Sequence, residues 1–508
     1  MIRVFESVAP PNGDTTMTIH DVMTRRDLMA AAAAGALLAT TRAPAQSRDD
    51  DLTKLSIADA SRRIAAREIS PVELTRAYLE RIERIDERVN AYITVTAEQA
   101  LEQARALERE LMAGRSRGPL HGIPLGLKDN IDTVGVLTTA ASAVYADRVP
   151  TKDARVVTLL RDAGAVFLGK LNMHEFAYGA TGVVTHYGPV RNPWDLDYIP
   201  GGSSSGSAAA VAARMCAAAL GTDTAGSIRV PAAYCGVVGL KVTHGLASIR
   251  GIVPLSETHD HVGPLARSVT DCALVMNALT GLDPLDPVSI DAPRGDLRDA
   301  IGSDVSGLRI GIPRAPFFED LDPEIAAATD AALAMLKDMT RELTDVELPS
   351  LDSSAVSNAE TYEYHAALAA DPARRALYKS WTIDRILSRA NVSSVDYIQS
   401  RRRLVIARNT VGDLFANVDV LVTPCAMRMP ATVEEALRDP RAFPFIRNTM
   451  PFNNYGIPAI SVPCGFTRAG LPIGLQISGP RLAEARVLAL AHAYEQATAW
   501  YRREPSLG

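Results

Sequence analysis

Two short clusters of small and hydroxyl-bearing residues contain the side chains most able to do chemistry. The first is GGSSSGS at residues 201–207, and the second is GTDTAGSIRVP at residues 221–231. Glycine and other small residues allow several backbone N–H groups to point into one cavity. A turn over residues 224–227 can present such donors to one oxygen atom beside the hydroxyl of Ser227. The clusters therefore predict a serine nucleophile next to an oxyanion hole.

The first cluster has two other interpretations. Residues 202–206 fit the G-x-S-x-G pattern of the nucleophile elbow in α/β-hydrolases, which needs a strand immediately before it. The preceding residues 192–200, NPWDLDYIP, contain two prolines and two aspartates, which disfavours that strand. A flexible glycine–serine linker is disfavoured because an alanine-rich helix is expected at residues 208–220. Neither alternative explains the second serine cluster.

A lysine stands at the end of an apolar run in residues 121–130, HGIPLGLKDN. A single lysine after a strand is normally a solvated surface group. Lys128 acquires a catalytic meaning only if the fold carries it to the serines. Burial must then lower its unperturbed pKa of about 10.4, so that a neutral amine is available as a base.

From about residue 52 to residue 500, the chain resembles the amidase signature family in many ordered segments. The matching segments are residues 122–130, 169–176, 191–194, 201–206, 221–231, 236–241, 261–269, 456–459 and 470–476. The chain departs from the usual family pattern at Ser205, Ala225 and Val242. None of these three positions belongs to the catalytic triad that the resemblance implies.

The resemblance implies a Ser-cisSer-Lys triad for this chain. Ser227 matches the nucleophile of the family, Ser203 matches the bridging serine, and Lys128 matches the general base. It also implies a cis peptide bond between Gly202 and Ser203. Lys128 would take a proton from Ser203, which takes one from Ser227 as the Ser227 hydroxyl attacks a carbonyl carbon.

The groups that stabilise the negative oxygen are implied by the same resemblance, whereas the pocket residues are a separate expectation. The N–H groups of Thr224, Ala225 and Gly226 would form the oxyanion hole. The walls of the substrate pocket are expected near Ala177 and Tyr178.

The elements that must position these residues alternate between short apolar runs and helical patterns. Residues 52–112 have helical periodicity, with Ser70, Pro71 and Glu73 as a helix start. Buried strands are expected at residues 123–127, 166–168, 237–240, 308–312, 418–422 and 460–462, and helices at 154–163 and 269–279. This alternation predicts an α/β fold with a mixed sheet. The resemblance implies the amidase signature fold, a mixed β-sheet core covered by helices on both faces.

Residues 352–417 form a mostly helical segment with a cluster of aromatic residues. The cluster comprises Tyr362, Tyr364, His365, Tyr378 and Trp381. One interpretation is a substrate-cap insertion over the active site. Ordinary packing of these side chains in the core explains the pattern equally well.

Residues 1–45 are predicted to be a twin-arginine export signal. Arg25 and Arg26 precede an alanine-rich stretch of about a dozen residues, and the segment ends in Ala43-Pro44-Ala45. The stretch is too short to span a bilayer, which needs about 20 apolar residues. The mature domain would then be residues 46–508, in the periplasm or secreted. The alternative is an alanine-rich N-terminal helix in a cytoplasmic protein.

The composition disfavours several functional classes. The 508 residues include 53 basic and 59 acidic ones, a net charge of −6, and no basic block marks a nucleic-acid or membrane surface. Five widely spaced cysteines without a CxxC pair disfavour a disulfide framework or a zinc site. His174-Glu175 stands alone, and His-Asp-His at residues 259–261 is more typical of a polar loop than of a metal site. We expect no metal, no cofactor and no stable membrane anchor.

Together with these observations, the resemblance to the amidase signature family implies hydrolysis of the C–N bond of a small-molecule carboxamide through a serine acyl-enzyme. The alternative is the A subunit of a glutamine-dependent tRNA amidotransferase, which has the same signature core and works with partner subunits in the cytosol. The predicted export signal disfavours that alternative. A non-catalytic binding protein is disfavoured because Lys128, Ser203 and Ser227 are all present. The sequence allows a homodimer and does not identify the amide.

Overall fold

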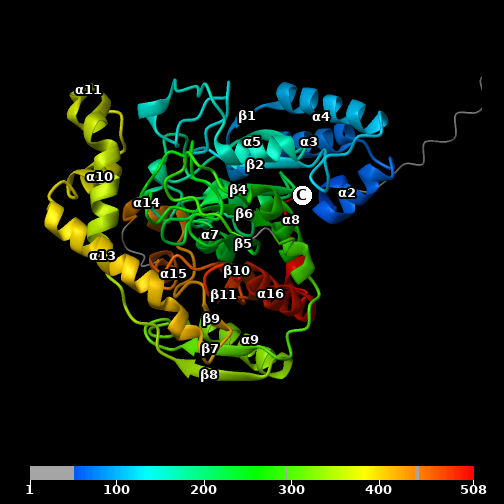
Figure 1. Cartoon of the computed structure of the whole chain (residues 1–508). Coiled ribbons are helices and arrows are strands. Elements are labelled where there is room, and N and C mark those ends of the chain that lie inside the picture. The colour runs from blue at the N-terminus through cyan, green and yellow to red at the C-terminus, as the bar shows by residue number, and fades with distance from the viewer. Residues whose placement is uncertain (1–50, 293–294, 441–445, 508) are drawn as a thin grey trace, which may run out of the picture. The chain divides into compact units, whose positions relative to one another are not determined.

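The centre of the molecule is a mixed sheet (Figure 1). The computed structural model describes residues 51–292, 295–440 and 446–507. The 11 strands of the sheet follow the order β1-β3-β2-β4-β6-β5-β10-β11-β9-β7-β8. They are β1 (Tyr92–Val95), β2 (Pro124–Lys128), β3 (Val166–Leu171), β4 (Ala218–Thr222), β5 (Val238–Lys241), β6 (Val262–Ala266), β7 (Arg309–Pro313), β8 (Glu342–Val346), β9 (Val420–Pro424), β10 (Ala459–Phe466) and β11 (Pro472–Ser478). The predicted α/β class is confirmed.

Helices connect the strands and cover the sheet. The α-helices are α2 (Ile57–Ala65), α3 (Pro71–Val89), α4 (Ala97–Met112), α5 (Arg155–Asp162), α6 (Ser205–Ala212), α7 (Arg229–Cys235), α8 (Val269–Leu279), α9 (Pro323–Met339), α10 (Ser354–Ala370), α11 (Pro372–Arg375), α12 (Ser380–Leu387), α13 (Ser394–Thr410), α14 (Val433–Arg438), α15 (Met450–Asn454) and α16 (Glu484–Thr498). Short 3₁₀ helices are η1 (Leu52–Lys54), η2 (Ala143–Tyr145), η3 (Glu175–Ala177), η4 (Leu297–Ala300), η5 (Val411–Phe415) and η6 (Trp500–Arg502).

The middle of the sheet is buried on both faces. Every residue of β2, β4, β5, β6, β9 and β11 is buried. α6 and α7 pack on each other and on these strands, and α8 and α16 form a second packed pair. Strands covered on both faces carry nearly continuous apolar residues, which explains why short apolar runs identified several of them. β2 runs parallel to its neighbours β3 and β4, whereas β10 and β11 are antiparallel.

The alanine-rich helix expected over residues 208–220 is wrong in its second half. The helix α6 ends at Ala212, and Arg214 adopts a left-handed backbone conformation with φ of 58°. Residues Ala218–Thr222 instead form β4, which lies between β2 and β6. Alanine favours helices, but pairing with two neighbouring strands in the core overrides that weak preference.

The opening segment is helical, as expected, with one interruption. Ser70 and Glu73 form a capping box at the start of α3, and Pro71 is its first residue. Asn90 ends α3 in a left-handed conformation, and β1 follows before α4 begins. β1, with the sequence YITV, pairs with β3 at the edge of the sheet. These four residues therefore form an edge strand and do not continue the helical segment.

Residues 352–417 form α10 to α13 and η5. The aromatic cluster of this segment divides between two roles. His365 and Tyr378 are buried and pack around Phe176, with ring centroids 4.6 and 5.2 Å from that of Phe176. Trp381 lines the cavity beside Ser227. His365 and Tyr378 are therefore core residues, whereas Trp381 faces the cavity.

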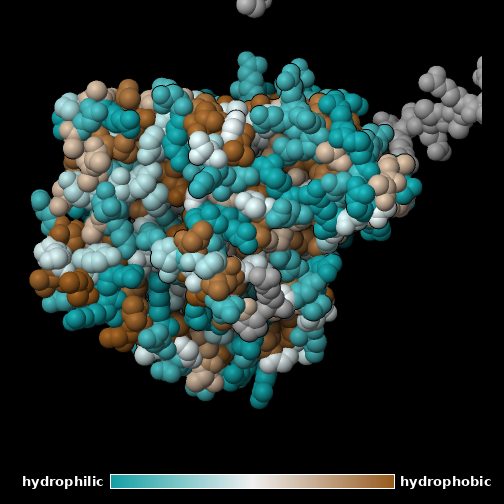
Figure 2. Space-filling model, turned by 45° about the horizontal axis from the view of Figure 1, so that its top comes forward, coloured by the Kyte–Doolittle hydropathy of each residue, from teal (hydrophilic) through white to brown (hydrophobic). Residues whose placement is uncertain are grey.

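The face shown in Figure 2 is mostly hydrophilic, with scattered apolar side chains. Among the described residues, no helix has both the length and the apolar character needed to cross a bilayer. All five cysteines are buried and unpaired. The predicted export signal of residues 1–45 lies outside the described residues.

Candidate active site

Lys128 is the last residue of β2 and is completely buried. Its Nζ atom lies 2.8 Å from Ser203 Oγ and 2.7 Å from Thr222 Oγ1. Because β2 and β4 are parallel neighbours, their carboxyl ends bring Lys128 and Thr222 to the same edge of the sheet. The fold thus carries the lysine to the first serine cluster, which is the condition that the sequence left open.

Burial lowers the pKa of Lys128 to about 7, although the negative charges of Asp223 and Asp260 raise it in part. A charged amine loses its hydration in the protein interior, and the surrounding hydroxyls do not replace a full counter-charge. A large fraction of Lys128 is therefore neutral near pH 7. A neutral amine 2.8 Å from a serine hydroxyl can act as a general base.

Ser203 is held between the lysine and the second serine cluster. The cis peptide bond expected between Gly202 and Ser203 is present. The carbonyl oxygen of Ser203 accepts a hydrogen bond from the backbone N–H of His174 at 3.1 Å. The next residue, Ser204, donates its N–H to the carbonyl oxygen of Ser227 at 3.2 Å. These backbone bonds tie the two serine-containing loops together.

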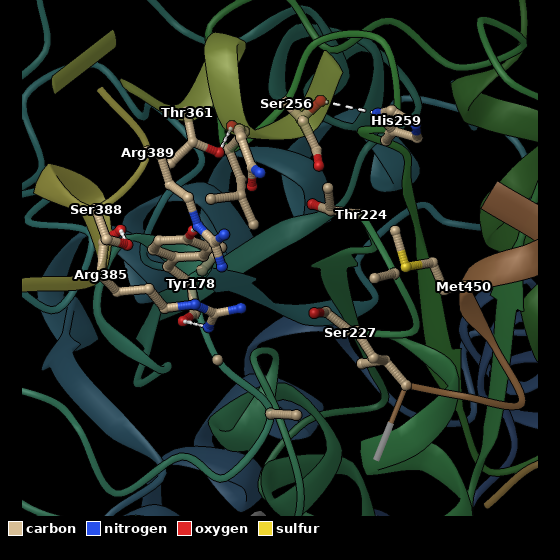
Figure 3. A pocket seen from close by; sticks show the side chains of 18 of the residues that line it. Tyr178, Thr224, Ser227, Ser256, His259, Thr361, Arg385, Ser388, Arg389 and Met450 are labelled. Atoms are coloured by element: carbon tan, nitrogen blue, oxygen red, sulfur yellow. Dashed lines mark hydrogen bonds between the residues drawn. The ribbon is translucent and has the colours of Figure 1, made fainter. Parts of the chain in front are cut away.

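Ser227 lies in the loop between β4 and α7 and is half-buried, whereas Ser203 and Lys128 are fully buried. Figure 3 shows its hydroxyl directed into a cavity. The hydroxyl accessible to a substrate is therefore that of Ser227, and the other two residues lie behind it.

The three positions of the predicted oxyanion hole differ in their hydrogen bonds. Within the described residues, the N–H groups of Thr224 and Ala225 make no hydrogen bond, and both residues line the cavity. The N–H of Gly226 differs, because it already donates to Asp223 Oδ1 at 2.7 Å. The Thr224 hydroxyl donates to Asp260 Oδ1 at 2.5 Å, which fixes the start of the loop. The oxyanion role predicted for Gly226 does not fit this geometry.

A buried ion pair braces the nucleophile loop from behind. Arg229 contacts Asp223 through two hydrogen bonds of 3.0 Å, and both side chains are fully buried. Asp223 Oδ2 also accepts the N–H of Ile228 at 3.1 Å. Burial alone would raise the pKa of Asp223, but the Arg229 guanidinium outweighs it and holds the pKa well below its usual range. Asp223 is therefore a fixed anion that shapes the loop.

The C-terminal part of the chain completes this brace. Arg229 also donates to Gln476 Oε1 at 2.7 Å and to Asn453 Oδ1 at 2.5 Å. Thr449 packs against Gly226, where an added Cβ would lie 2.1 Å from Thr449 Oγ1. Gly226 has a φ of 132°, so both its conformation and its surroundings require glycine.

The cavity in front of Ser227 has a volume of about 480 Å³. Ala177 and Tyr178, the expected pocket residues, line it. Residues of α10 and α12 form another part of the wall, among them Thr361, Trp381 and Arg385. The cavity is large enough for a small molecule and has aromatic and polar walls.

The histidines singled out in the sequence have structural partners. His174 is buried beside Trp381, with ring centroids 5.0 Å apart. His259 lines the cavity and contacts the hydroxyls of Ser256 and Ser353 at 2.9 and 3.0 Å. Among the residues that the structure describes, no group of three or more histidine, cysteine, aspartate or glutamate side chains is arranged to hold a metal ion.

Sequence reasoning missed four residues that act at this site. Thr222 contacts Lys128, Asp260 holds Thr224, and Arg385 and Arg389 line the cavity. A strand before Thr222 would be the signal for it, but the sequence predicts a helix over residues 208–220. The arginines carry no such signal, because arginine on a helix is usually solvated.

The site combines a buried lysine, a serine that follows a cis peptide bond and a second serine that faces the cavity. A sequence model described as amidase matches residues 73–488. The chain belongs to the amidase signature family.

Three similar proteins span nearly the whole chain. The A subunit of glutamyl-tRNA(Gln) amidotransferase from Moorella thermoacetica is 40% identical, and the match covers 90% of this chain and 99% of the relative. The crystal structure of a peptide amidase from Stenotrophomonas maltophilia is 32% identical with a TM-score of 0.79, covering 89% and 99% of the two chains. The structure of the corresponding amidotransferase subunit from Thermotoga maritima is 32% identical with a TM-score of 0.75, covering 88% and 96%.

Proposed function

We propose that this protein hydrolyses the C–N bond of a carboxamide through an acyl-enzyme on Ser227. The observation that carries the proposal is the fully buried Lys128, whose Nζ lies 2.8 Å from the hydroxyl of a cis-linked Ser203 behind an accessible Ser227. A buried amine of low pKa next to a hydroxyl chain is suited to activate a serine at neutral pH.

The reaction proceeds by proton transfer and acyl transfer. Lys128 accepts a proton from Ser203, which accepts one from Ser227 as the Ser227 oxygen bonds to the amide carbon. The N–H groups of Thr224 and Ala225 stabilise the negative oxygen of the tetrahedral intermediate. The C–N bond then breaks, and the leaving amine takes back the proton through the same chain. Water hydrolyses the resulting ester to a carboxylic acid and free Ser227.

Replacement of the nucleophile tests the proposal. Ser227→Ala is expected to reduce amide hydrolysis by at least 10³-fold, because the variant lacks the hydroxyl that forms the acyl-enzyme. Release of the amine from a panel of aryl, fatty and amino-acid amides measures the effect. Ser205→Ala is the matched control, since the buried Ser205 hydroxyl has no hydrogen-bond partner among the described residues. Retained activity in Ser227→Ala would contradict the mechanism.

A second candidate function is favoured by the similar proteins. The relative at 40% identity is named as a subunit of glutamyl-tRNA(Gln) amidotransferase. Under this alternative, the same site would release ammonia from glutamine, and the chain would work with other subunits. The solved peptide amidase, which covers 89% of this chain, favours the first candidate.

Substrate choice by the isolated chain separates the two candidates. An independent amidase is expected to hydrolyse one or more amides of the panel as a purified single chain. A component of an amidotransferase is expected to act on glutamine and to gain activity when partner subunits and tRNA are added. Glutaminase activity that depends on such subunits would replace the first candidate with the second.

We also propose roles for two other segments of the chain. Residues 352–417 act as a substrate cap, supported by the side chains of α10 and α12 in the cavity wall. Residues 1–45 act as a twin-arginine export signal, supported by the paired arginines, the alanine-rich stretch and the Ala-Pro-Ala ending. Export would place the enzyme in the periplasm or outside the cell.

A further inference from the structure

One arginine on the cavity wall is fixed by its neighbours. Arg385, in α12, stacks on Tyr178 with its Cζ 4.0 Å from the ring centroid and lies 5.1 Å from that of Trp381. Its Nη1 donates to the carbonyl oxygen of Tyr178 at 2.9 Å. Cation–π contacts and this bond hold the guanidinium against the wall. The contribution of Arg385 to the site is therefore a fixed positive charge.

The second arginine of the cavity wall, Arg389, has fewer contacts than Arg385. Arg389 follows the end of α12 and is half-buried, and its Nε donates to the Tyr178 hydroxyl at 3.4 Å. Within the described residues, its Nη1 and Nη2 atoms make no hydrogen bond, and its guanidinium forms no ion pair. Figure 3 shows both guanidinium groups directed toward the cavity, into which Ser227 also points. Arg389 therefore offers unused donors inside the substrate site.

The charges around the cavity favour an anion. Two guanidinium groups face it, and the lining carboxylate, Asp384, is exposed to solvent. The base, Lys128, lies behind Ser227 and is not part of the lining. The planar fork of a guanidinium matches a carboxylate through two parallel N–H···O bonds.

We propose that Arg389 binds a carboxylate of the substrate, so that the enzyme acts on amides that carry a carboxylate at the end remote from the scissile bond. This inference rests on the proposed amide hydrolysis at Ser227. The substrate would reach from Ser227 along the ring of Tyr178 to the Nη atoms of Arg389, which make no hydrogen bond with any described residue. A cavity of about 480 Å³ suits a small acid-amide of this kind.

The first test compares two amides of equal chain length. Glutaramate carries a carboxylate at the far end, and pentanamide carries a methyl group there. The kcat/KM of the full-length enzyme is expected to be at least 10-fold higher for glutaramate, because a charge-assisted hydrogen bond contributes more than the apolar contact it replaces. Equal values, or a preference for pentanamide, would overturn the inference.

The second test removes the guanidinium. Arg389→Met is expected to lower kcat/KM for glutaramate about 10- to 100-fold, mainly through KM, and to leave pentanamide within about twofold. Arg389→Lys, which keeps the charge, should recover part of the loss. Arg402→Met in α13 is the matched control, because Arg402 is exposed and does not line the cavity. It should leave both substrates unchanged.

The outcomes separate this inference from the proposed function. An equal loss on both substrates in Arg389→Met, together with a lower melting temperature, would show a structural role and overturn the inference. Hydrolysis of both amides at equal rates by the wild type and by Arg389→Met would also overturn it, while amide hydrolysis would stand. Hydrolysis that survives Ser227→Ala would instead overturn the proposed function itself.

Discussion

Lys128 shows how one residue changes its chemistry through its surroundings. In water its amine would be almost fully protonated at pH 7, but complete burial lowers its pKa to about 7. Two hydroxyls, those of Ser203 and Thr222, lie within 2.8 Å of Nζ. A neutral amine can accept a proton from Ser203 while it donates to Thr222. Lys128 can therefore act as the base toward Ser203 while Thr222 holds its amine in place.

The pKa of Lys128 predicts the pH dependence of the reaction. The base is the neutral form, which predominates above the pKa, so kcat/KM should rise tenfold per pH unit below about 7 and level off above it. Lys128→Ala should lower turnover by about 10³-fold and abolish this rise. Initial rates between pH 5 and pH 9 measure both effects. An unchanged pH profile in Lys128→Ala would exclude the lysine as the base.

At the scale of elements, the active site depends on the loop between β4 and α7. Strand pairing puts Thr222 beside Lys128, and the next residue, Asp223, turns the chain so that Ser227 faces the cavity. Arg229 holds Asp223 and is itself held by α15 and β11. The loop is thus stabilised by elements that lie more than 200 residues away in the sequence.

Loss of this brace should reduce stability as well as activity. Arg229→Met would leave the Asp223 carboxylate buried without its counter-charge, which is expected to lower the free energy of unfolding by about 3–5 kcal/mol. Urea-induced unfolding at pH 7 measures the change, with the exposed Arg402→Met as the comparison. A loss below about 1 kcal/mol would show that the pair does not brace the loop.

At the scale of the whole molecule, compartment and partners separate the two candidate functions. The relatives named as amidotransferase subunits match nearly the full length of the chain, so the shared architecture does not decide between the candidates. The N-terminal segment does distinguish them, because an exported protein would be separated from tRNA. An experiment that tests export therefore also distinguishes an independent amidase from an amidotransferase subunit.

Mass spectrometry of the protein from its native host tests the export proposal. The mature chain is expected to begin at Gln46 and to be recovered from the periplasm or the medium. Replacing Arg25 and Arg26 with lysine should retain the protein in the cytoplasm. A cytoplasmic product that keeps residues 1–45 would contradict the proposal.

The sequence alone determined the chemistry-bearing residues and the fold class. Lys128, Ser203 and Ser227 stand in ordered motifs that are local in sequence, and short apolar runs identified buried strands because such runs reflect burial on both faces. The same local signals failed for β4, since alanine and glycine alone do not indicate a strand. Pairing between distant segments decided that element.

The tertiary structure alone decided which groups meet. The contact of Thr222 with Lys128, the use of the Gly226 N–H by Asp223, and the place of Arg389 in the cavity each join segments or atoms whose relation no spacing encodes. The lowered pKa of Lys128 is of the same kind, because it follows from the exclusion of water by the packed core around it. The sequence specifies the residue types, whereas the distances between groups, their burial and the balance of their charges arise only when distant parts of the chain pack together.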